Sequence, residues 1–147
     1  MEALSKDFKE FIILLNKQKI EYLLVGGYAV ILYGSPRYTG DIDFWVKPER
    51  NNIEKLLDAL NQFGFSSLNI QVDDLNKPDQ VLQLGYPPLR IDILTSISGL
   101  DFDNCLPNSQ TFDIEGLKIK VIGLEDLKKN KKAVSRFKDL DDLENLE

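Results

Sequence analysis

The amino-acid sequence predicts a mixed α/β (α+β) fold: a short mixed central sheet flanked by helices, with further helices at the C-terminal end. Stretches with the apolar spacing of helices alternate with short apolar stretches typical of buried strands. Two strand-like stretches near residues 111–121 are joined by a two-residue turn. The 147 residues contain no repeat and no obvious linker, so we expect one domain over residues 1–147.

The first half of the chain predicts three helices and two strands. Apolar residues at i, i+3, i+4 and i+7 indicate an amphipathic helix over residues 5–19, and they are Phe8, Phe11, Ile12 and Leu15. We expect strands at residues 22–25 and 41–46. Residues 28–33 are apolar throughout and fit helix or strand; we assign a helix, because a glycine pair after a strand commonly opens one. A third helix carries Ile53, Leu56, Leu57, Leu60 and Phe63 and is closed by Gly64.

The second half predicts strands first and helices last. Residues 65–94 have the composition of loops and strands, with strands expected at 81–84 and 89–94. Residues 111–114 and 117–121 flank Glu115-Gly116, which is typical of a hairpin turn. Residues 124–147 predict two helices with a break near Ser135.

The composition excludes several chemistries. The chain has no histidine, so it cannot form a Ser-His-Asp triad, a Cys-His pair or a histidine-ligated zinc site. The lone Cys105 excludes an internal disulfide and a cysteine-rich zinc site. Carboxylates are abundant, with 24 Asp and Glu against 18 Lys and Arg, and they are the ligands that Mg²⁺ or Mn²⁺ prefers. The net charge of −6 argues against binding to long duplexes.

The hydropathy pattern predicts no membrane segment. The longest apolar stretch, residues 22–33, is interrupted by Gly26 and Gly27 and is too short to span a bilayer. No basic stretch precedes an apolar core at the N-terminus, so no signal peptide is predicted. We therefore expect a cytoplasmic protein.

Asp41 and Asp43 form the first candidate site. Residues two apart on a strand point to the same face, so both carboxylates project together while Ile42 faces the opposite way. Their repulsion would be relieved by a bound divalent cation. The alternative is a solvated strand end.

Asp92 lies in an otherwise apolar strand, on the same face as Arg90 and Leu94. A buried acid rarely improves stability, which favours a third metal ligand. The alternative is a structural ion pair with Arg90.

Gly26 and Gly27 follow the strand at 22–25 and precede the helix assigned at 28–33. A glycine turn lets backbone approach phosphate oxygens, and helix N–H groups favour anions. The alternative is a tight turn that needs positive φ.

The C-terminal stretch places a cation on an apolar helix face. Helical geometry puts Lys131 on the face of Leu124, Leu127 and Val134, whereas Lys129 points away. A packed cation needs an anion, either a ligand phosphate or a carboxylate of the protein. Asp139 is the protein carboxylate that could pair with Lys131 and join two helices.

These stretches together resemble the signature of the polymerase-β-like nucleotidyltransferase superfamily, and within it the small prokaryotic branch related to AbiEii-type toxins. The resemblance is carried by Val25-Gly26-Gly27-Tyr28-Ala29-Val30, by Gly34, Arg37 and Thr39, and by Asp41-Ile42-Asp43-Phe44. Two later blocks are similar to the same family: Arg90-Ile91-Asp92-Ile93-Leu94 with Gly99 and Asp101-Phe102, and Asn130-Lys131-Lys132-Ala133 with Arg136, Lys138-Asp139-Leu140 and Asp142-Leu143. The resemblance implies a short central sheet in which the strands of Asp43 and Asp92 are neighbours.

One position departs from the superfamily. In many members a serine follows the first glycine and contacts phosphate, whereas this chain has Gly27. Phosphate contact would then depend on backbone N–H groups, with help from Ser35 or Arg37.

The resemblance implies a nucleotidyltransferase that moves a nucleoside monophosphate from an NTP to an acceptor and releases pyrophosphate. Asp41, Asp43 and Asp92 would hold two Mg²⁺ or Mn²⁺ ions, and Asp92 would also accept the acceptor's proton. Lys131 and Asp139 are implied to serve nucleotide binding or catalysis. The acceptor would be RNA, a protein hydroxyl or a small molecule such as an antibiotic.

Two other interpretations stay open. One is a catalytically silent relative that binds a nucleotide or a partner protein. The other is a toxin neutralised by an antitoxin protein, which concerns the biological role rather than the chemistry.

Overall fold

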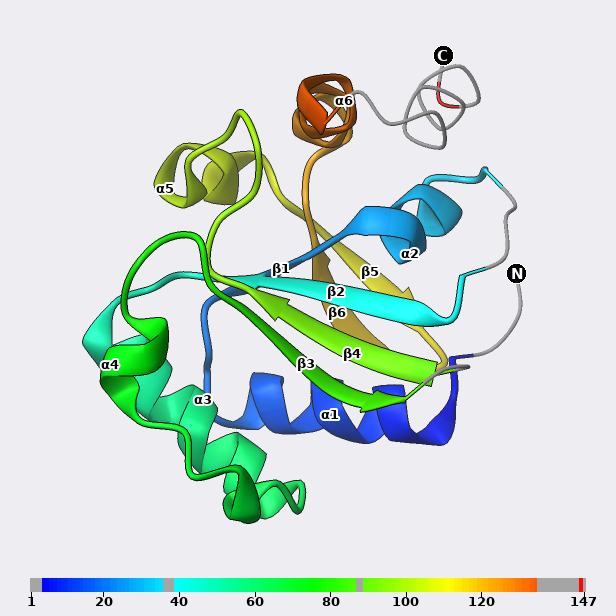
Figure 1. Cartoon of the computed structure of the whole chain (residues 1–147). Coiled ribbons are helices and arrows are strands. Elements are labelled where there is room, and N and C mark those ends of the chain that lie inside the picture. The colour runs from blue at the N-terminus through cyan, green and yellow to red at the C-terminus, as the bar shows by residue number, and fades with distance from the viewer. Residues whose placement is uncertain (1–3, 36–38, 87–88, 135–145, 147) are drawn as a thin grey trace.

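The structure is a computed structural model that describes residues 4–35, 39–86, 89–134 and 146. Its centre is a six-stranded sheet with strand order β3-β4-β2-β1-β6-β5 (Figure 1). The strands are β1 (Tyr22–Val25), β2 (Asp41–Val46), β3 (Val81–Tyr86), β4 (Leu89–Leu94), β5 (Gln110–Ile114) and β6 (Leu117–Val121). β2 pairs with β4 and β1 with β6 in parallel, and the other neighbours are antiparallel. The predicted mixed sheet flanked by helices is confirmed.

Helices lie on both faces of this sheet. In Figure 1, α1 (Lys6–Lys17) and α3 (Arg50–Gln62) lie on one side, and α2 (Gly26–Leu32) and α6 (Leu124–Val134) lie on the other. The shorter elements are α4 (Val72–Leu75), α5 (Phe102–Cys105) and the 3₁₀ turns η1 (Ser66–Leu68) and η2 (Leu106–Asn108). Within the described ranges, no helix combines the length and the apolar composition needed to span a membrane.

The alternation of side chains along β2 separates the core from the site. The ring of Phe44 lies 5.5 Å from that of Phe11 on α1, whereas the ring of Trp45 lies 5.1 Å from that of Phe102 on α5. Successive strand residues point to opposite faces, so Asp41 and Asp43 share the face of Trp45. Both carboxylates therefore lie on the side of the sheet that carries α2, α5 and α6.

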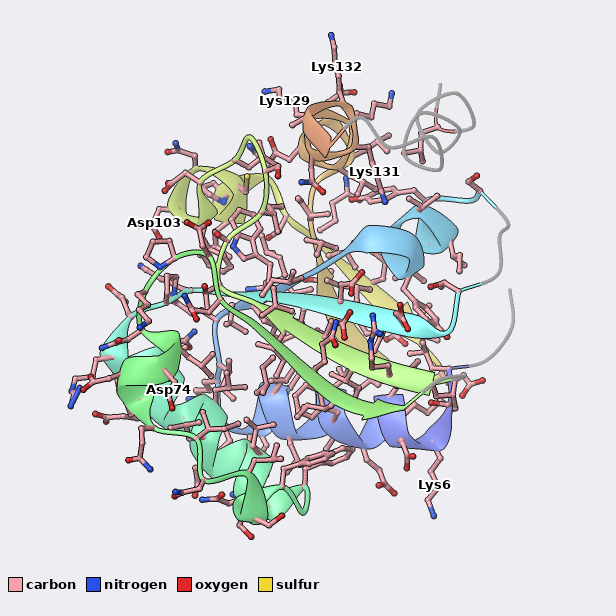
Figure 2. The ribbon with its side chains drawn as sticks, viewed as in Figure 1. Lys6, Asp74, Asp103, Lys129, Lys131 and Lys132 are labelled. Atoms are coloured by element: carbon pink, nitrogen blue, oxygen red, sulfur yellow. The ribbon has the colours of Figure 1, made fainter. Side chains whose placement is uncertain are left out.

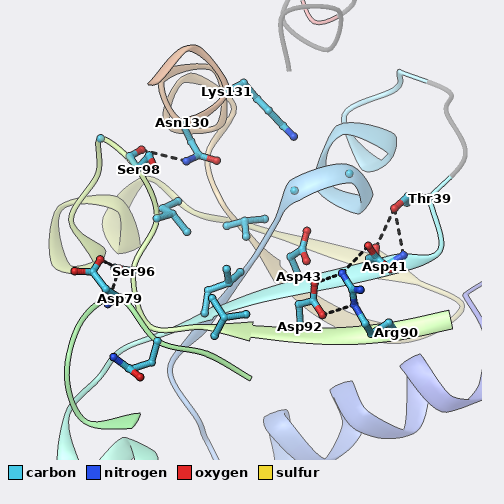
Figure 3. Close-up of a pocket in the computed structure, with 18 residues that line it drawn as sticks. Thr39, Asp41, Asp43, Asp79, Arg90, Asp92, Ser96, Ser98, Asn130 and Lys131 are labelled. Atoms are coloured by element: carbon cyan, nitrogen blue, oxygen red, sulfur yellow. Dashed lines mark hydrogen bonds and ion pairs between the residues drawn. The ribbon is translucent and has the colours of Figure 1, made fainter. Parts of the chain in front are cut away.

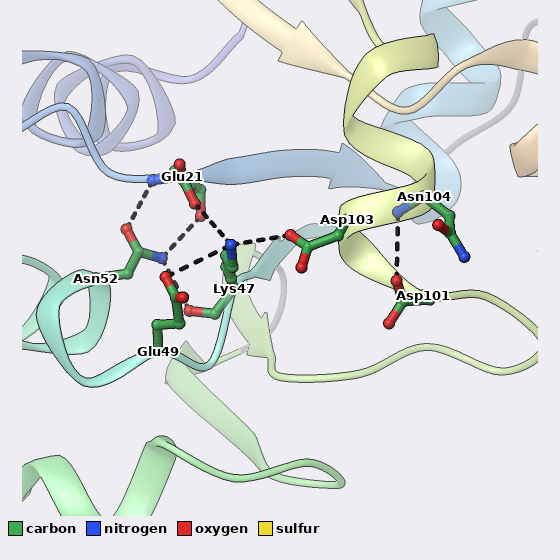
Figure 4. A network of polar contacts seen from close by, with 7 residues as sticks. All are labelled: Glu21, Lys47, Glu49, Asn52, Asp101, Asp103 and Asn104. Atoms are coloured by element: carbon green, nitrogen blue, oxygen red, sulfur yellow. Dashed lines mark hydrogen bonds and ion pairs between the residues drawn. The ribbon is translucent and has the colours of Figure 1, made fainter.

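Lys47 connects the end of β2 to its surroundings (Figure 4). Its ammonium lies 2.9 Å from a carboxylate oxygen of Asp103, 3.5 Å from Glu49 and 3.9 Å from Glu21. The buried Asn52 donates to the carbonyls of Glu21 and Lys47 and accepts from the N–H of Glu21. These contacts hold the starts of β1, α3 and α5 together at the end of β2.

Three predictions about the elements need correction or fall outside the described residues. α2 begins at Gly26, two residues before the predicted start, because Gly26 has φ of 71° and turns the chain directly from β1 into the helix. α4 and α5 were not predicted, since four residues are too few to show a helical period. The second predicted C-terminal helix lies outside the described residues apart from residue 146.

Candidate active site

Three acidic side chains converge because two parallel strands lie in register. Asp43 of β2 is paired with Asp92 of β4, and Asp41 is paired with Arg90. Paired residues of adjacent strands point to the same face, so all four side chains lie together. Figure 3 shows the carboxylates of Asp41, Asp43 and Asp92 above the sheet, in one cavity. The predicted juxtaposition of the three carboxylates on neighbouring strands is present.

Arg90 joins two of these carboxylates. Its Nε donates to Asp92 Oδ1 over 2.8 Å, and its Nη2 donates to Asp92 Oδ2 over 3.0 Å and to Asp41 Oδ2 over 3.1 Å. The Arg90–Asp92 ion pair that the sequence suggested as an alternative is therefore present, and it extends to Asp41. The guanidinium stands as a cation between two of the proposed metal ligands.

Within the cluster, the carboxyl group of Asp43 has a raised pKa. Burial, followed by the charges of Asp92 and Asp41, raises the pKa of its carboxyl to about 6, and the charge of Lys131 acts in the opposite direction. A hydrogen bond between the side chains of Asp43 and Asp92 also raises this pKa. A second cation beside Asp43 would relieve the repulsion that burial and neighbouring charge create.

The two positions at the start of α2 hold glycine for different structural reasons. At Gly26, φ is 71°, and a Cβ atom would lie 2.1 Å from Asp43 Oδ2. A side chain at this position would be strained by the positive φ and would displace the carboxylate of Asp43, which lies directly against the backbone. At Gly27, a Cβ atom would lie 3.2 Å from the Cβ and Oγ1 atoms of Thr39. Both glycines line the same cavity as the carboxylates.

This cavity has a volume of about 770 Å³. Of the residues proposed from the sequence, it is lined by Gly26, Gly27, Asp41, Asp43, Asp92 and Lys131. Its other polar lining residues are Thr39, Asp79, Gln80, Arg90, Ser96, Ser98 and Asn130. No role was predicted for Asp79, Ser96 or Asn130, because their convergence depends on loop positions that the sequence pattern does not encode.

Lys131 lies on the packed face of α6, as its helical position predicts. It is only 3% exposed, and its side chain extends from α6 into the cavity over the carboxylates (Figure 3). Its neighbour Asn130 donates to the carbonyl of Ser98 over 3.1 Å, which fixes α6 against the loop after β4. Lys129 is exposed and points away from the cavity (Figure 2).

The remaining predicted nucleotide-binding residues are not part of this arrangement. Ser35 is buried, but it is not among the residues that line the cavity. The suggestion that its hydroxyl helps to hold phosphate has no support in this geometry. Arg37 and Asp139 lie outside the described residues.

The donor chemistry fits a hard divalent cation. All three carboxylates offer oxygen ligands, which Mg²⁺ and Mn²⁺ prefer. In the part of the chain that the structure describes, no group of three or more acidic or thiol side chains is arranged to hold a metal ion as it stands. Arg90 contacts both Asp41 and Asp92, so a metal ion that used both ligands would compete with it.

Two solved structures share the fold of this chain. A solved structure of the lincosamide antibiotic adenylyltransferase LnuA, lincomycin-bound, is similar with a TM-score of 0.60 at 16% identity, over 99% of this chain and 98% of that chain. An antigenic nucleotidyltransferase-like protein from Paracoccidioides brasiliensis has a TM-score of 0.60 at 19% identity, over 99% of this chain and 78% of that chain. At these identities, the likeness shows a shared fold. No curated protein matches the chain.

The family model described as "Nucleotidyl transferase of unknown function (DUF2204)" matches residues 4–147. The chain belongs to this family and is a nucleotidyltransferase.

Proposed function

We propose that the protein transfers a nucleoside monophosphate from an NTP to a hydroxyl-bearing acceptor, with Mg²⁺ or Mn²⁺ bound by Asp41, Asp43 and Asp92. The observation that carries this proposal is the register of β2 and β4, which sets Asp43 beside Asp92 in a cavity over which Lys131 extends. Such a cavity combines oxygen ligands for a cation with a positive charge for phosphate. Both are needed for phosphoryl transfer, in which positioning and electrostatics supply most of the catalysis.

Each residue has a role that its place in the cavity supports. Asp41 and Asp43 would hold the cations, and Asp92 would hold one of them and take the proton from the attacking hydroxyl. Divalent cations held there would supply positive charge that stabilises the charge developing on the reacting phosphate. Lys131 offsets negative charge on the phosphates.

Gly26 and Gly27 line the cavity at the start of α2. The absence of their own side chains lets Asp43 and Thr39 pack against this turn, and backbone N–H groups at the helix start favour phosphate. Cation binding by Asp41 and Asp92 would require Arg90 to give up its bonds to both carboxylates. Arg37 and Asp139, which lie outside the described residues, remain proposed nucleotide-binding residues on the resemblance alone.

The finer biological role is also a proposal. A small-molecule acceptor is supported by the similarity to an adenylyltransferase of lincosamide antibiotics. The resemblance of the sequence to AbiEii-type toxins supports an RNA or protein acceptor instead, with a cytoplasmic toxin held by an antitoxin protein. One domain over residues 1–147 is the organisation that we propose for either role.

Incubation with each labelled NTP, Mg²⁺ or Mn²⁺ and a cell lysate tests the function. We expect one NTP to label one fraction, whether RNA, protein or small molecules, and to release pyrophosphate. Asp43→Asn should abolish the label, whereas the matched control Asp7→Asn, an exposed carboxylate on α1, should not. Labelling that survives in Asp43→Asn would contradict the proposed site.

A catalytically silent nucleotide-binding protein is the second candidate. The observation that favours it is the guanidinium of Arg90, which already neutralises Asp41 and Asp92. This candidate predicts that NTP raises the melting temperature while no lysate fraction becomes labelled and no pyrophosphate is released.

A further inference from the structure

We propose that Thr39 supplies the side-chain hydroxyl that contacts the triphosphate, in the space that a side chain at position 27 would otherwise occupy. This inference rests on the proposed nucleotidyl transfer, because it assumes that phosphate enters the cavity. It assigns a substrate-positioning role to a residue that lies outside the cluster of carboxylates and Lys131.

The space beside Gly27 is filled by Thr39. A Cβ atom on Gly27 would lie 3.2 Å from both Cβ and Oγ1 of Thr39 and 3.3 Å from its Cγ2. Gly27 is not among the glycines with positive φ, so its backbone conformation is open to any residue. Glycine at this position is therefore explained by the packing of Thr39 rather than by backbone strain.

The hydroxyl of Thr39 is held beside the first carboxylate-bearing residue. Its Oγ1 donates to the carbonyl of Asp41 over 3.1 Å and accepts from the N–H of Asp41 over 3.3 Å (Figure 3). Both contacts are long, and a hydroxyl can rotate its hydrogen toward a better acceptor. A phosphate oxygen beside Asp41 would be such an acceptor, because hydrogen bonds to charged groups are stronger than those to a neutral carbonyl.

Thr39 is better placed than Ser35 to offer a side-chain hydroxyl to a phosphate in the cavity. Ser35 does not line the cavity, whereas Thr39 lines it together with Gly26, Gly27 and Asp41. Thr39 thus places a hydroxyl at the wall formed by the start of α2, while Lys131 supplies the charge from α6.

Paired substitutions at Thr39 provide the first test. We would measure the affinity for a non-hydrolysable NTP analogue with Mg²⁺, and separately the shift in melting temperature with Mg²⁺ alone. Thr39→Val keeps the shape but removes the hydroxyl, so we expect about a tenfold loss of analogue affinity with the metal-only shift unchanged. Thr39→Ser should retain the affinity.

Moving the hydroxyl gives the sharper test. Gly27→Ser alone should weaken analogue binding, because its side chain crowds Thr39. Gly27→Ser combined with Thr39→Ala returns a hydroxyl to the same space without the bonds to Asp41, and we expect it to recover most of the affinity lost in Thr39→Ala. A folded double variant that recovers nothing would overturn the inference, because the loss would then act through Asp41.

The results also separate this inference from the proposed function. If the wild-type protein binds no NTP analogue in the presence of metal, the proposed function and the role of Thr39 both fall. If the wild type binds and Thr39→Val binds equally well, only the role of Thr39 falls. A loss of the metal-only shift in Thr39→Val would likewise overturn it, since Thr39 would then be a support for Asp41.

Discussion

Gly26 and Asp43 lie so close together that a Cβ atom on Gly26 would stand 2.1 Å from Asp43 Oδ2. Gly26→Ala should therefore destabilise the protein twice, through the positive φ and through displacement of the carboxylate. We expect the free energy of unfolding to fall by about 2–4 kcal/mol and metal-dependent activity to be lost. Urea denaturation and the transfer assay would measure the two effects.

Gly64→Ala is the matched control for this prediction. Gly64 also has positive φ, at 103°, but a Cβ atom there would have no neighbour within 4 Å. It should cost only the backbone strain, about 1–2 kcal/mol, and leave activity intact. Equal effects of the two substitutions would show that the approach of Asp43 to Gly26 does not constrain the site.

The raised pKa of Asp43 predicts how the stability of the metal-free protein depends on pH. The folded protein holds this proton with a pKa of about 6, above the ordinary value of 3.8. The resulting stabilisation is complete below about pH 3.8 and is lost as the pH rises through 6, in total roughly 2–3 kcal/mol. Asp43→Asn should remove this dependence and be the more stable protein at pH 8. The free energy of unfolding of both proteins would be measured by denaturant titration from pH 4 to 8. If it changed with pH by the same amount in both, the prediction would be contradicted.

Arg90 should stabilise the metal-free protein and compete with added metal. Without its guanidinium, Asp41 and Asp92 lose a shared counter-ion, so Arg90→Gln should lower the melting temperature in the absence of divalent cations. The same variant should gain more stability from Mn²⁺ than the wild type does, because its ligands are no longer occupied. Arg50→Gln, an exposed ion-paired arginine on α3, is the control and should change neither quantity appreciably.

Substitution of Lys131 distinguishes a residue that contacts the substrate from one with a purely structural role. If it contacts the triphosphate, Lys131→Ala should lower NTP affinity or turnover about ten- to a hundredfold. Lys129→Ala, which removes an exposed lysine of the same helix, should have no effect. If Lys131 instead pairs with Asp139, Lys131→Ala should destabilise the protein by about 3–5 kcal/mol. Adding Asp139→Ala should then restore that stability.

The local sequence pattern was sufficient to predict the two strands that carry the carboxylates. Alternation and flanking turns predicted the bounds of β2 and β4 to the residue, and the structure confirms them. Helical spacing likewise predicted the burial of Lys131, which is fixed by its position relative to Leu127 on the same helix. Each of these features depends on residues close together in the chain.

Contacts between distant segments could not be predicted in this way. The pairing of Arg90 with Asp41 joins residues 49 positions apart, and the packing of Thr39 against Gly27 depends on the path between α2 and β2. From the sequence, help with phosphate contact was expected from Ser35 or Arg37, and Thr39 was named only as part of the family resemblance. The Asp79–Ser96 side of the cavity was missed for the same reason, since it forms only when two loops meet.

The parallel pairing of β2 with β4 has a consequence for folding. The segment with Asp41 and Asp43 must close a long loop before it meets Asp92, and such non-local pairing is a slow step with a high entropic cost. Until the two central strands pair, Asp41 and Asp43 lie apart from Asp92, so the three carboxylates have no shared affinity for a cation. Any cation that the assembled cluster binds therefore stabilises the whole sheet by mass action, and the melting temperature reports its binding directly.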